Sequence, residues 1–174
     1  MEVEAKFRLK EGVLEKIERV AKFVEEKEEF DLYFNHPCRD FAKTDEALRL
    51  RIEKRVKMTY KGPKVDSETK TREEINVSVD NFENAVKLLE SLGFKKFRTV
   101  KKTRKIFSIE NAIVCVDHVE GLGDFIEIEV GSLAEKEKIF QIAESLGYSR
   151  EESIRTSYLE LILEKIKSGS IERW

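Results

Sequence analysis

Charged residues recur two positions apart in several short segments of the chain, with acidic and basic groups mixed and mostly apolar residues between them. The charged residues are Glu2, Glu4, Lys6 and Arg8; Arg49, Arg51, Glu53 and Arg55; Arg72 and Glu74; Lys102 and Arg104; and Glu127 and Glu129. Asp117 stands in the same way beside Cys115. Because side chains alternate between the two faces of a β-strand, each segment predicts a strand with a charged face.

This mixture of charges favours a site for a complex of a metal with a polyphosphate. Guanidinium groups make bidentate contacts to phosphate oxygens, and ammonium groups act as point charges. The predicted phosphate-binding set is Lys6, Arg8, Arg49, Arg51, Lys61, Arg72, Lys102 and Arg104. Mg²⁺ and Mn²⁺ prefer oxygen ligands, which Glu2, Glu4, Glu74, Asp117, Glu127 and Glu129 supply. The sequence has no Gly-x-x-x-x-Gly-Lys-Ser/Thr loop, so side chains would hold the phosphates.

These residues must be positioned by the elements that the hydrophobic pattern predicts. Alternation and turn residues predict strands at 2–9, 29–34, 47–55, 57–61, 71–79, 97–109, 112–118 and 124–130. Apolar residues at helical spacing predict helices at 11–26, 81–92, 133–146 and 150–167, and Ser149 with Glu152 favours the start of the last one. No Ser/Gly-rich linker interrupts the chain, so residues 1–174 are expected to form one domain.

Two arrangements of the charged faces are open at this point. An ordinary antiparallel sheet can present a polar face to water. The amphipathic helices, however, need apolar sheet surface, and a sheet that closes with its apolar face outward under them places the charges in an interior. Buried charges are costly unless they pair and hold a charged ligand. We therefore expect an α+β fold in which a closed antiparallel β-barrel forms a tunnel, with helices packed on the outside.

Several motifs, in this order, resemble those of the CYTH superfamily, the triphosphate tunnel metalloenzymes. They are Glu2-Val3-Glu4-Ala5-Lys6, Asp31-Leu32-Tyr33-Phe34, Arg39-Asp40-Phe41, Ala47-Leu48-Arg49-Leu50-Arg51, Thr59-Tyr60-Lys61-Gly62-Pro63, Arg72-Glu73-Glu74, Lys102-Thr103-Arg104, the segment 117–129, and Ser157-Tyr158. The chain is most similar to the class IV adenylate cyclase branch, and thiamine triphosphatases share the charged positions.

The resemblance implies an eight-stranded antiparallel tunnel and assigns roles to the charged residues. It implies that Glu2, Glu4, Glu127 and Glu129 bind Mg²⁺ or Mn²⁺ and that the basic residues hold the phosphates. Lys6, Glu74 and Asp117 are the expected catalytic residues. The roles of Glu74 and Asp117 are open between ligands of metal or water and partners that orient the basic groups.

Three functions remain open. As an adenylate cyclase, the protein would convert ATP to cyclic AMP and pyrophosphate. As a hydrolase, it would release orthophosphate from thiamine triphosphate, a nucleotide or inorganic tripolyphosphate. As a non-catalytic module, it would only bind a nucleotide or polyphosphate, although simple capture of an anion would not need so many carboxylates. The expected partner is thus a small-molecule triphosphate.

The composition limits the cellular setting. The 33 basic and 35 acidic residues nearly cancel to a net charge of −2, which argues against bulk nucleic-acid binding. No window approaches the roughly 18 apolar residues of a membrane helix and no signal pattern occurs, so a cytoplasmic protein is expected. Abundant Lys and Glu with few amides is typical of thermophiles. Neither a disulfide nor a zinc site is expected from Cys38 and Cys115, and a homodimer is left open.

Overall fold

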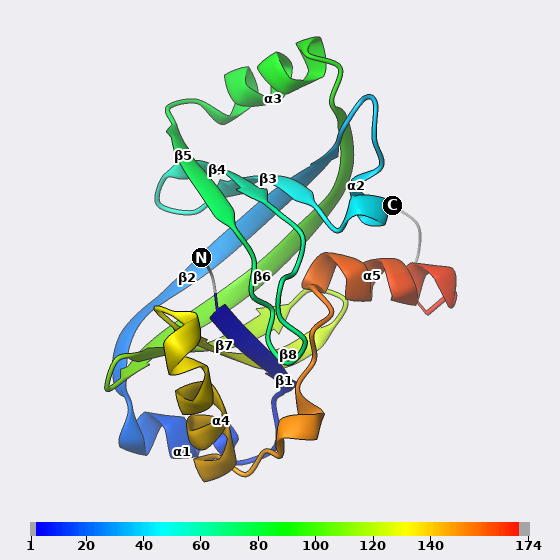
Figure 1. Ribbon diagram of the computed structural model, residues 1–174. Helices are drawn as coiled ribbons and strands as arrows, with labels where there is room; N and C mark the ends of the chain where they lie inside the picture. The colour runs from blue at the N-terminus through cyan, green and yellow to red at the C-terminus, as the bar shows by residue number, and fades with distance from the viewer. Residues whose placement is uncertain (1–2, 171–174) are drawn as a thin grey trace.

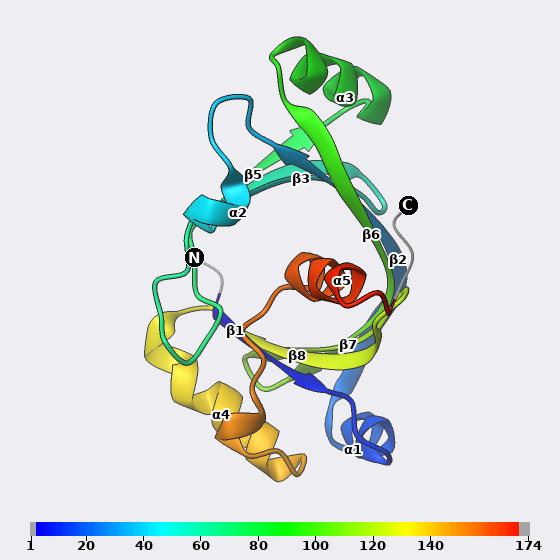
Figure 2. The same cartoon turned by 90° about the vertical axis from the view of Figure 1, so that its right-hand side faces the viewer.

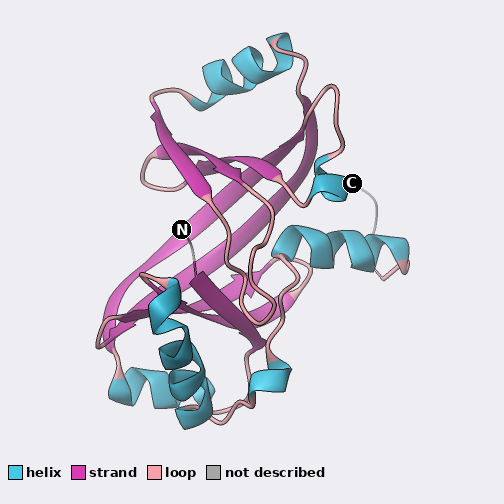
Figure 3. Ribbon diagram, viewed as in Figure 1, coloured by secondary structure: helices cyan, strands magenta, loops and turns pink. Residues whose placement is uncertain are grey.

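The structure is a computed structural model that describes residues 3–170, in which a single curved sheet lies between groups of helices (Figures 1 and 3). The strands are β1 (Val3–Arg8), β2 (Lys22–Asn35), β3 (Ala47–Ile52), β4 (Val56–Lys61), β5 (Glu74–Val79), β6 (Lys95–Ile109), β7 (Ala112–Val119) and β8 (Gly123–Val130). The helices are α1 (Val13–Val20), α2 (Phe41–Thr44), α3 (Phe82–Ser91), α4 (Lys136–Ser145) and α5 (Tyr158–Lys167), with 3₁₀ turns η1 (Leu133–Glu135) and η2 (Arg150–Glu152). None of the helices in this range is long and apolar enough to cross a membrane.

The eight strands form one antiparallel sheet in the order β1-β8-β7-β6-β2-β3-β4-β5. The two longest strands, β2 and β6, pair with each other and run side by side through the whole molecule (Figure 1). Every predicted strand is present. The antiparallel α+β fold with eight strands is confirmed.

The predicted closed barrel is not confirmed. Strands β1 and β5 are the two edges of the sheet, and no ladder joins them within residues 3–170. Residues 62–73, which we call the strap, connect β4 to β5 and reach β1, where the Lys70 N–H donates to the Glu4 carbonyl at 2.9 Å. The Ile154 N–H donates to the Lys6 carbonyl at 2.7 Å on the same strand. Segments outside the sheet therefore satisfy part of the open edge of β1.

Helices α1, α3 and α4 cover the outer, convex side of the sheet, as predicted. Helices α1 and α4 bury Ile17, Ile139 and Phe140 against apolar side chains of β1, β7 and β8. Helix α3 buries Val86 and Leu89 against residues of β2 and β3. The apolar faces of the strands thus point outward to these helices, which leaves the charged faces on the concave side.

Helix α5 lies on the concave side, so the prediction that all helices pack outside is wrong for this element (Figure 2). Its Tyr158 and Ile162 pack with Val100, Val119 and Phe125 in a separate apolar cluster. Those strand residues share the concave face with the charged side chains but lie nearer one end of it. The concave face therefore has an apolar part, which a helix can cover, beside its charged part. Strand alternation alone does not distinguish these two parts, because their residues lie on the same face.

Several element boundaries also differ from the predictions. The strand expected at 71–79 begins at Glu74, which leaves Arg72 in the strap, and the strand expected at 47–55 ends at Ile52. The expected helix 11–26 ends at Val20, and the chain continues as the extended strand β2 from Lys22. The expected helix 150–167 is divided into η2 and α5, because Ser149 with Glu152 forms a capping box for a single 3₁₀ turn. A second capping box, Ser157 with Glu160, starts the true helix.

Candidate functional site

The charged faces of the strands converge on a cavity of about 150 Å³. Of the residues predicted for the site, the cavity is lined by Glu4, Arg49, Arg51, Lys61, Arg72, Lys102, Arg104 and Glu127. They come from β1, β3, β4, β6, β8 and the strap, so segments distant in the sequence meet here. The convergence of basic and acidic groups that the sequence predicted is present, although the wall is an open curved sheet completed by the strap and α5.

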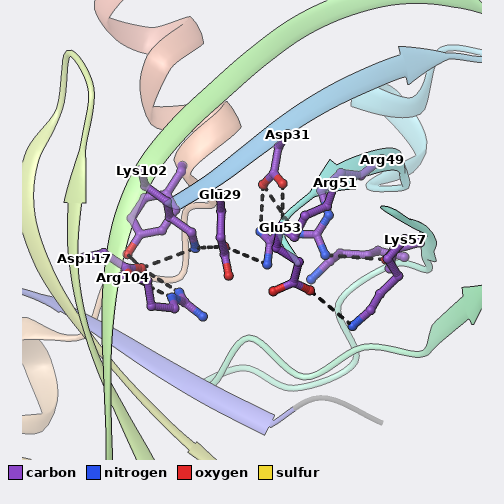
Figure 4. Close-up of polar contacts among 12 residues, drawn as sticks. Glu29, Asp31, Arg49, Arg51, Glu53, Lys57, Lys102, Arg104 and Asp117 are labelled. Atoms are coloured by element: carbon purple, nitrogen blue, oxygen red, sulfur yellow. Dashed lines mark hydrogen bonds and ion pairs between the residues drawn. The ribbon is translucent and has the colours of Figure 1, made fainter. Parts of the chain in front are cut away.

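Asp117 of β7 is the centre of one buried cluster (Figure 4). Its carboxylate accepts from Arg104 Nε at 2.7 Å and Nη2 at 2.6 Å, and from the Tyr158 hydroxyl at 2.8 Å. Arg104 also pairs with Glu127 of β8. Burial opposes the charge of Arg104, but Asp117 and Glu127 raise its pKa well above the ordinary value. The cluster therefore keeps a permanent cation at the base of the cavity.

A second cluster joins β2, β3 and β6. Asp31 accepts from Arg51 Nε at 2.6 Å and Nη2 at 2.7 Å, and Glu29 lies between Arg51 Nη1 at 2.8 Å and Lys102 Nζ at 3.2 Å (Figure 4). Burial would raise the pKa of Glu29, but the charges of Lys102 and Arg51 hold it well below its usual range. Arg49 Nη1 lies 3.6 Å from Asp31. Carboxylates thus hold the predicted phosphate-binding groups in place.

Lys6 of β1 lies just behind the cavity wall and is only 1% exposed. Its ammonium donates to the Thr156 carbonyl at 2.7 Å, lies 3.6 Å from Glu127 and stands 4.1 Å above the ring of Tyr158. Burial, followed by the charge of Lys70, lowers the pKa of Lys6 to about 8. Burial therefore makes the Lys6 ammonium easier to deprotonate than that of an exposed lysine.

The carboxylates predicted to bind metal are on neighbouring strands. Glu4 of β1 is paired in register with Glu129 of β8, and Glu127 lies two positions along the same face. Glu4 contacts Lys70 at 2.6 Å, between Oε1 and Nζ. Glu2 lies outside the described residues. Over residues 3–170, no three acidic, His or Cys side chains gather as in a formed metal site, but the oxygen donors of this edge fit a hard divalent cation.

Of the remaining predicted residues, Glu74 and Arg8 do not line the cavity, whereas Arg72 lines it from the strap. Glu74 of β5 pairs with Lys61, which suits the orienting role that the sequence left open for it. Arg72 of the strap lies 3.3 Å from Asp45. Arg8 is not brought to the cavity: it is exposed, stands 4.2 Å above the ring of Phe125 and donates to the Leu122 carbonyl.

Sequence reasoning missed Glu29, Asp31, Lys70 and Tyr158 as site residues. Glu29 and Asp31 stand two positions apart within the predicted strand 29–34, which is the same signal that identified the other charged faces, but no site role was assigned to them. Lys70 lies in a loop, where no periodicity shows which way a side chain points. Tyr158 reaches the site only because α5 lies on the concave side.

Apolar side chains also line the cavity. Tyr33, Phe41, Phe97, Leu159 and Leu163 line the same space as the charged groups. They come from β2, α2, β6 and α5. A ligand could therefore place a charged part among the Arg and Lys residues and an organic part against these side chains.

The family follows from this sequence and fold together. The sequence model of the CYTH domain matches residues 1–158. The chain belongs to the CYTH domain family. The motif-based resemblance is thereby confirmed, and this CYTH domain includes every strand, the strap and the start of α5.

Named relatives of this CYTH protein include cyclases. It is 41% identical over 171 residues to the Methanocaldococcus jannaschii protein MJ0240, provisionally named an adenylate cyclase, covering 92% of this chain and 98% of that one. It is 26% identical over 156 residues to adenylate cyclase CyaB of Aeromonas hydrophila, covering 84% of this chain and 78% of the other.

Solved structures share the same fold. PH1819 of Pyrococcus horikoshii matches with a TM-score of 0.88 at 43% identity, covering 95% of this chain and 99% of that chain. HpAC1 from Hippeastrum matches with a TM-score of 0.68 at 17% identity, covering 99% and 98% of the two chains. HpAC1 is described as an adenylyl cyclase candidate with a dominant triphosphatase activity. At that identity the likeness supports the fold alone.

Proposed function

We propose that this CYTH protein is a divalent-metal-dependent enzyme that acts on a triphosphate, and that its reaction resembles that of class IV adenylate cyclases. The observation that carries the proposal is one cavity in which Arg49, Arg51, Lys102 and Arg104 stand beside the carboxylates of Glu4 and Glu127. A site for a bare anion would not include so many carboxylates, because they repel it.

In this proposal, Glu4, Glu127 and Glu129 hold Mg²⁺ or Mn²⁺. The metal, when bound, neutralises charge on the triphosphate oxygens. The Arg and Lys side chains bind and orient the phosphates, and their fixed charges stabilise the negative charge that builds up toward the leaving group. Asp117 and Glu29 hold these basic groups in position through the contacts described above.

Lys6 is the residue we propose for proton transfer or charge stabilisation next to the transferred phosphoryl group. Its pKa of about 8 lets both protonation states exist near neutrality. Its contact with the Thr156 carbonyl fixes the ammonium at the start of α5.

The reaction can follow two courses. Attack of the ribose 3′-oxygen on the α-phosphorus of ATP gives cyclic AMP and pyrophosphate. Attack of water on the terminal phosphorus of ATP, thiamine triphosphate or tripolyphosphate gives orthophosphate. The cyclase names of MJ0240 and CyaB favour the first course, and the apolar side chains that line the cavity favour a substrate with an organic group.

Product analysis tests the proposal. The protein is incubated with ATP, thiamine triphosphate or tripolyphosphate, with Mg²⁺ or Mn²⁺, at elevated temperature, and the products are separated by ion-exchange chromatography. Cyclic AMP with pyrophosphate supports the cyclase, and orthophosphate supports the hydrolase. Binding of triphosphates without any product would refute an enzymatic function and favour a binding module.

A further inference from the structure

The strap is fixed at its tip to the helical layer below the sheet. Asp66 accepts from the Thr69 N–H at 2.7 Å and from the Thr69 hydroxyl at 2.8 Å, which closes the turn. Lys136 of α4 bridges Asp66 at 3.1 Å and Glu68 at 2.6 Å. Arg150 of η2 also contacts Glu68 at 3.1 Å. These contacts connect the tip to α4 and η2.

Those residues turn into the cavity. Thr69 and Thr71 are fully buried, with their hydroxyl oxygens 2.7 Å apart. Between them, Lys70 donates its backbone N–H to the Glu4 carbonyl and its ammonium to Glu4 Oε1 at 2.6 Å. Lys70 and Arg72 both line the cavity. The strap thus brings two further cations to the side of the site where the open sheet has no strand.

Lys70 and a divalent cation would share the carboxylate of Glu4. A cation such as Mg²⁺ binds carboxylate oxygens at about 2.0–2.1 Å, and the Lys70 ammonium already contacts Glu4 Oε1 at hydrogen-bond distance. Two positive charges that close to each other repel strongly in a buried site. The long, flexible stem of a lysine lets its ammonium move while its backbone stays in place.

We propose that Lys70 is a positioning residue that exchanges partners: a divalent cation takes Glu4, and the displaced Lys70 ammonium contacts the triphosphate. The inference rests on the proposed function, because it requires both ligands to use this cavity. The backbone hydrogen bond from Lys70 to Glu4 and the anchored tip keep the exchange local to the side chain. Lys70 thereby weakens the binding of the cation in the absence of a triphosphate and favours the binding of the cation together with a triphosphate.

The experiment compares Lys70→Met with Lys61→Met, which removes a cavity lysine that pairs with Glu74 instead. Mn²⁺ binding without triphosphate is measured by electron paramagnetic resonance, and binding of tripolyphosphate with Mg²⁺ by calorimetry. Lys70→Met should raise the affinity for Mn²⁺ by about tenfold and lower that for tripolyphosphate by about tenfold, as expected for removing one close charge. Lys61→Met should lower the affinity for tripolyphosphate with a clearly smaller effect on Mn²⁺.

Lys70→Arg should return both affinities toward the wild-type values, because it keeps the charge. If Lys70→Met fails to fold, Lys70→Gln removes the same charge while retaining a donor to Glu4. Unchanged or weaker Mn²⁺ binding in the neutral variant would overturn the exchange while leaving the proposed function intact. Wild-type protein that binds neither Mn²⁺ nor tripolyphosphate would refute both.

Discussion

Replacing Asp117 by Asn tests whether buried ion pairs hold the concave face together. The change preserves the size of the side chain and removes its negative charge. In the wild type, Asp117 is fully buried and accepts two hydrogen bonds from Arg104 and one from Tyr158, while Lys102 lies 3.4 Å away. The variant leaves Arg104 with Glu127 as its remaining contact among the carboxylates described above.

The expected loss of stability follows from the burial of these charges. Removing one partner of a buried pair costs about 3–5 kcal/mol, because it leaves a buried charge uncompensated. Glu127 still faces Arg104, so we expect the lower end, about 3 kcal/mol. For a chain of this size that corresponds to a fall in melting temperature of roughly 6–12 °C.

Guanidinium unfolding followed by circular dichroism measures the effect, with Tyr158→Phe as the matched control. The control removes only the hydroxyl donor to Asp117 and should cost less, about 1.5 kcal/mol. In a double-mutant cycle, Asp117→Asn combined with Arg104→Met should lose about 1–3 kcal/mol less than the sum of the single changes. A loss below about 1 kcal/mol for Asp117→Asn, or strict additivity, would refute the reasoning.

Three further predictions use other residues of the site and fold. Glu29→Gln should lower the melting temperature most above pH 5, with the gap narrowing as the pH falls below 4.5, because the lowered pKa of Glu29 gives stability that is lost on protonation; a gap independent of pH contradicts this. Between pH 7 and 9, the affinity of the wild type for tripolyphosphate, measured by calorimetry, should fall by up to about tenfold per pH unit relative to that of Lys6→Met, since Lys6 loses its charge near pH 8. The same pH dependence of the affinity in both proteins would contradict this prediction. Gly93→Ala should destabilise the fold by about 1–2 kcal/mol in denaturant unfolding, because Gly93 has φ +92° and a Cβ would lie 3.2 Å from Pro37; an unchanged midpoint contradicts it.

The strands and their charged faces could be predicted because alternation is a local property of the sequence. Arg49 and Arg51 share the concave face with Lys102 and Arg104, as their spacing indicated. The N-terminal half of β2 could not be predicted in this way. Val20, Ala21 and Val24 have helical spacing, and the long pairing with β6 that makes this segment extended depends on residues far away in the chain.

The parts of the fold and of the site that the sequence did not predict also depend on contacts between distant segments of the chain. Whether β1 meets β5 depends on how far the sheet curves, and no single strand reports this. Lys70 and Tyr158 reach the site from a loop and from a helix whose side of the sheet is set by tertiary packing. By contrast, the prediction that acids and bases share one cavity followed from strand periodicity together with the need of the amphipathic helices for apolar sheet surface, and eight of the predicted residues line the cavity.

The carboxylates that hold the basic groups also bear on which anions the cavity can accept. Arg51, Lys102 and Arg104 each already have an acidic partner within 3.5 Å, so an incoming anion must compete with internal counter-ions. A single orthophosphate offers few charges for that competition and would be a poor ligand. A chain of linked phosphates can replace several counter-ions in one binding event, so the cavity would discriminate by the length of the anion as well as by its charge.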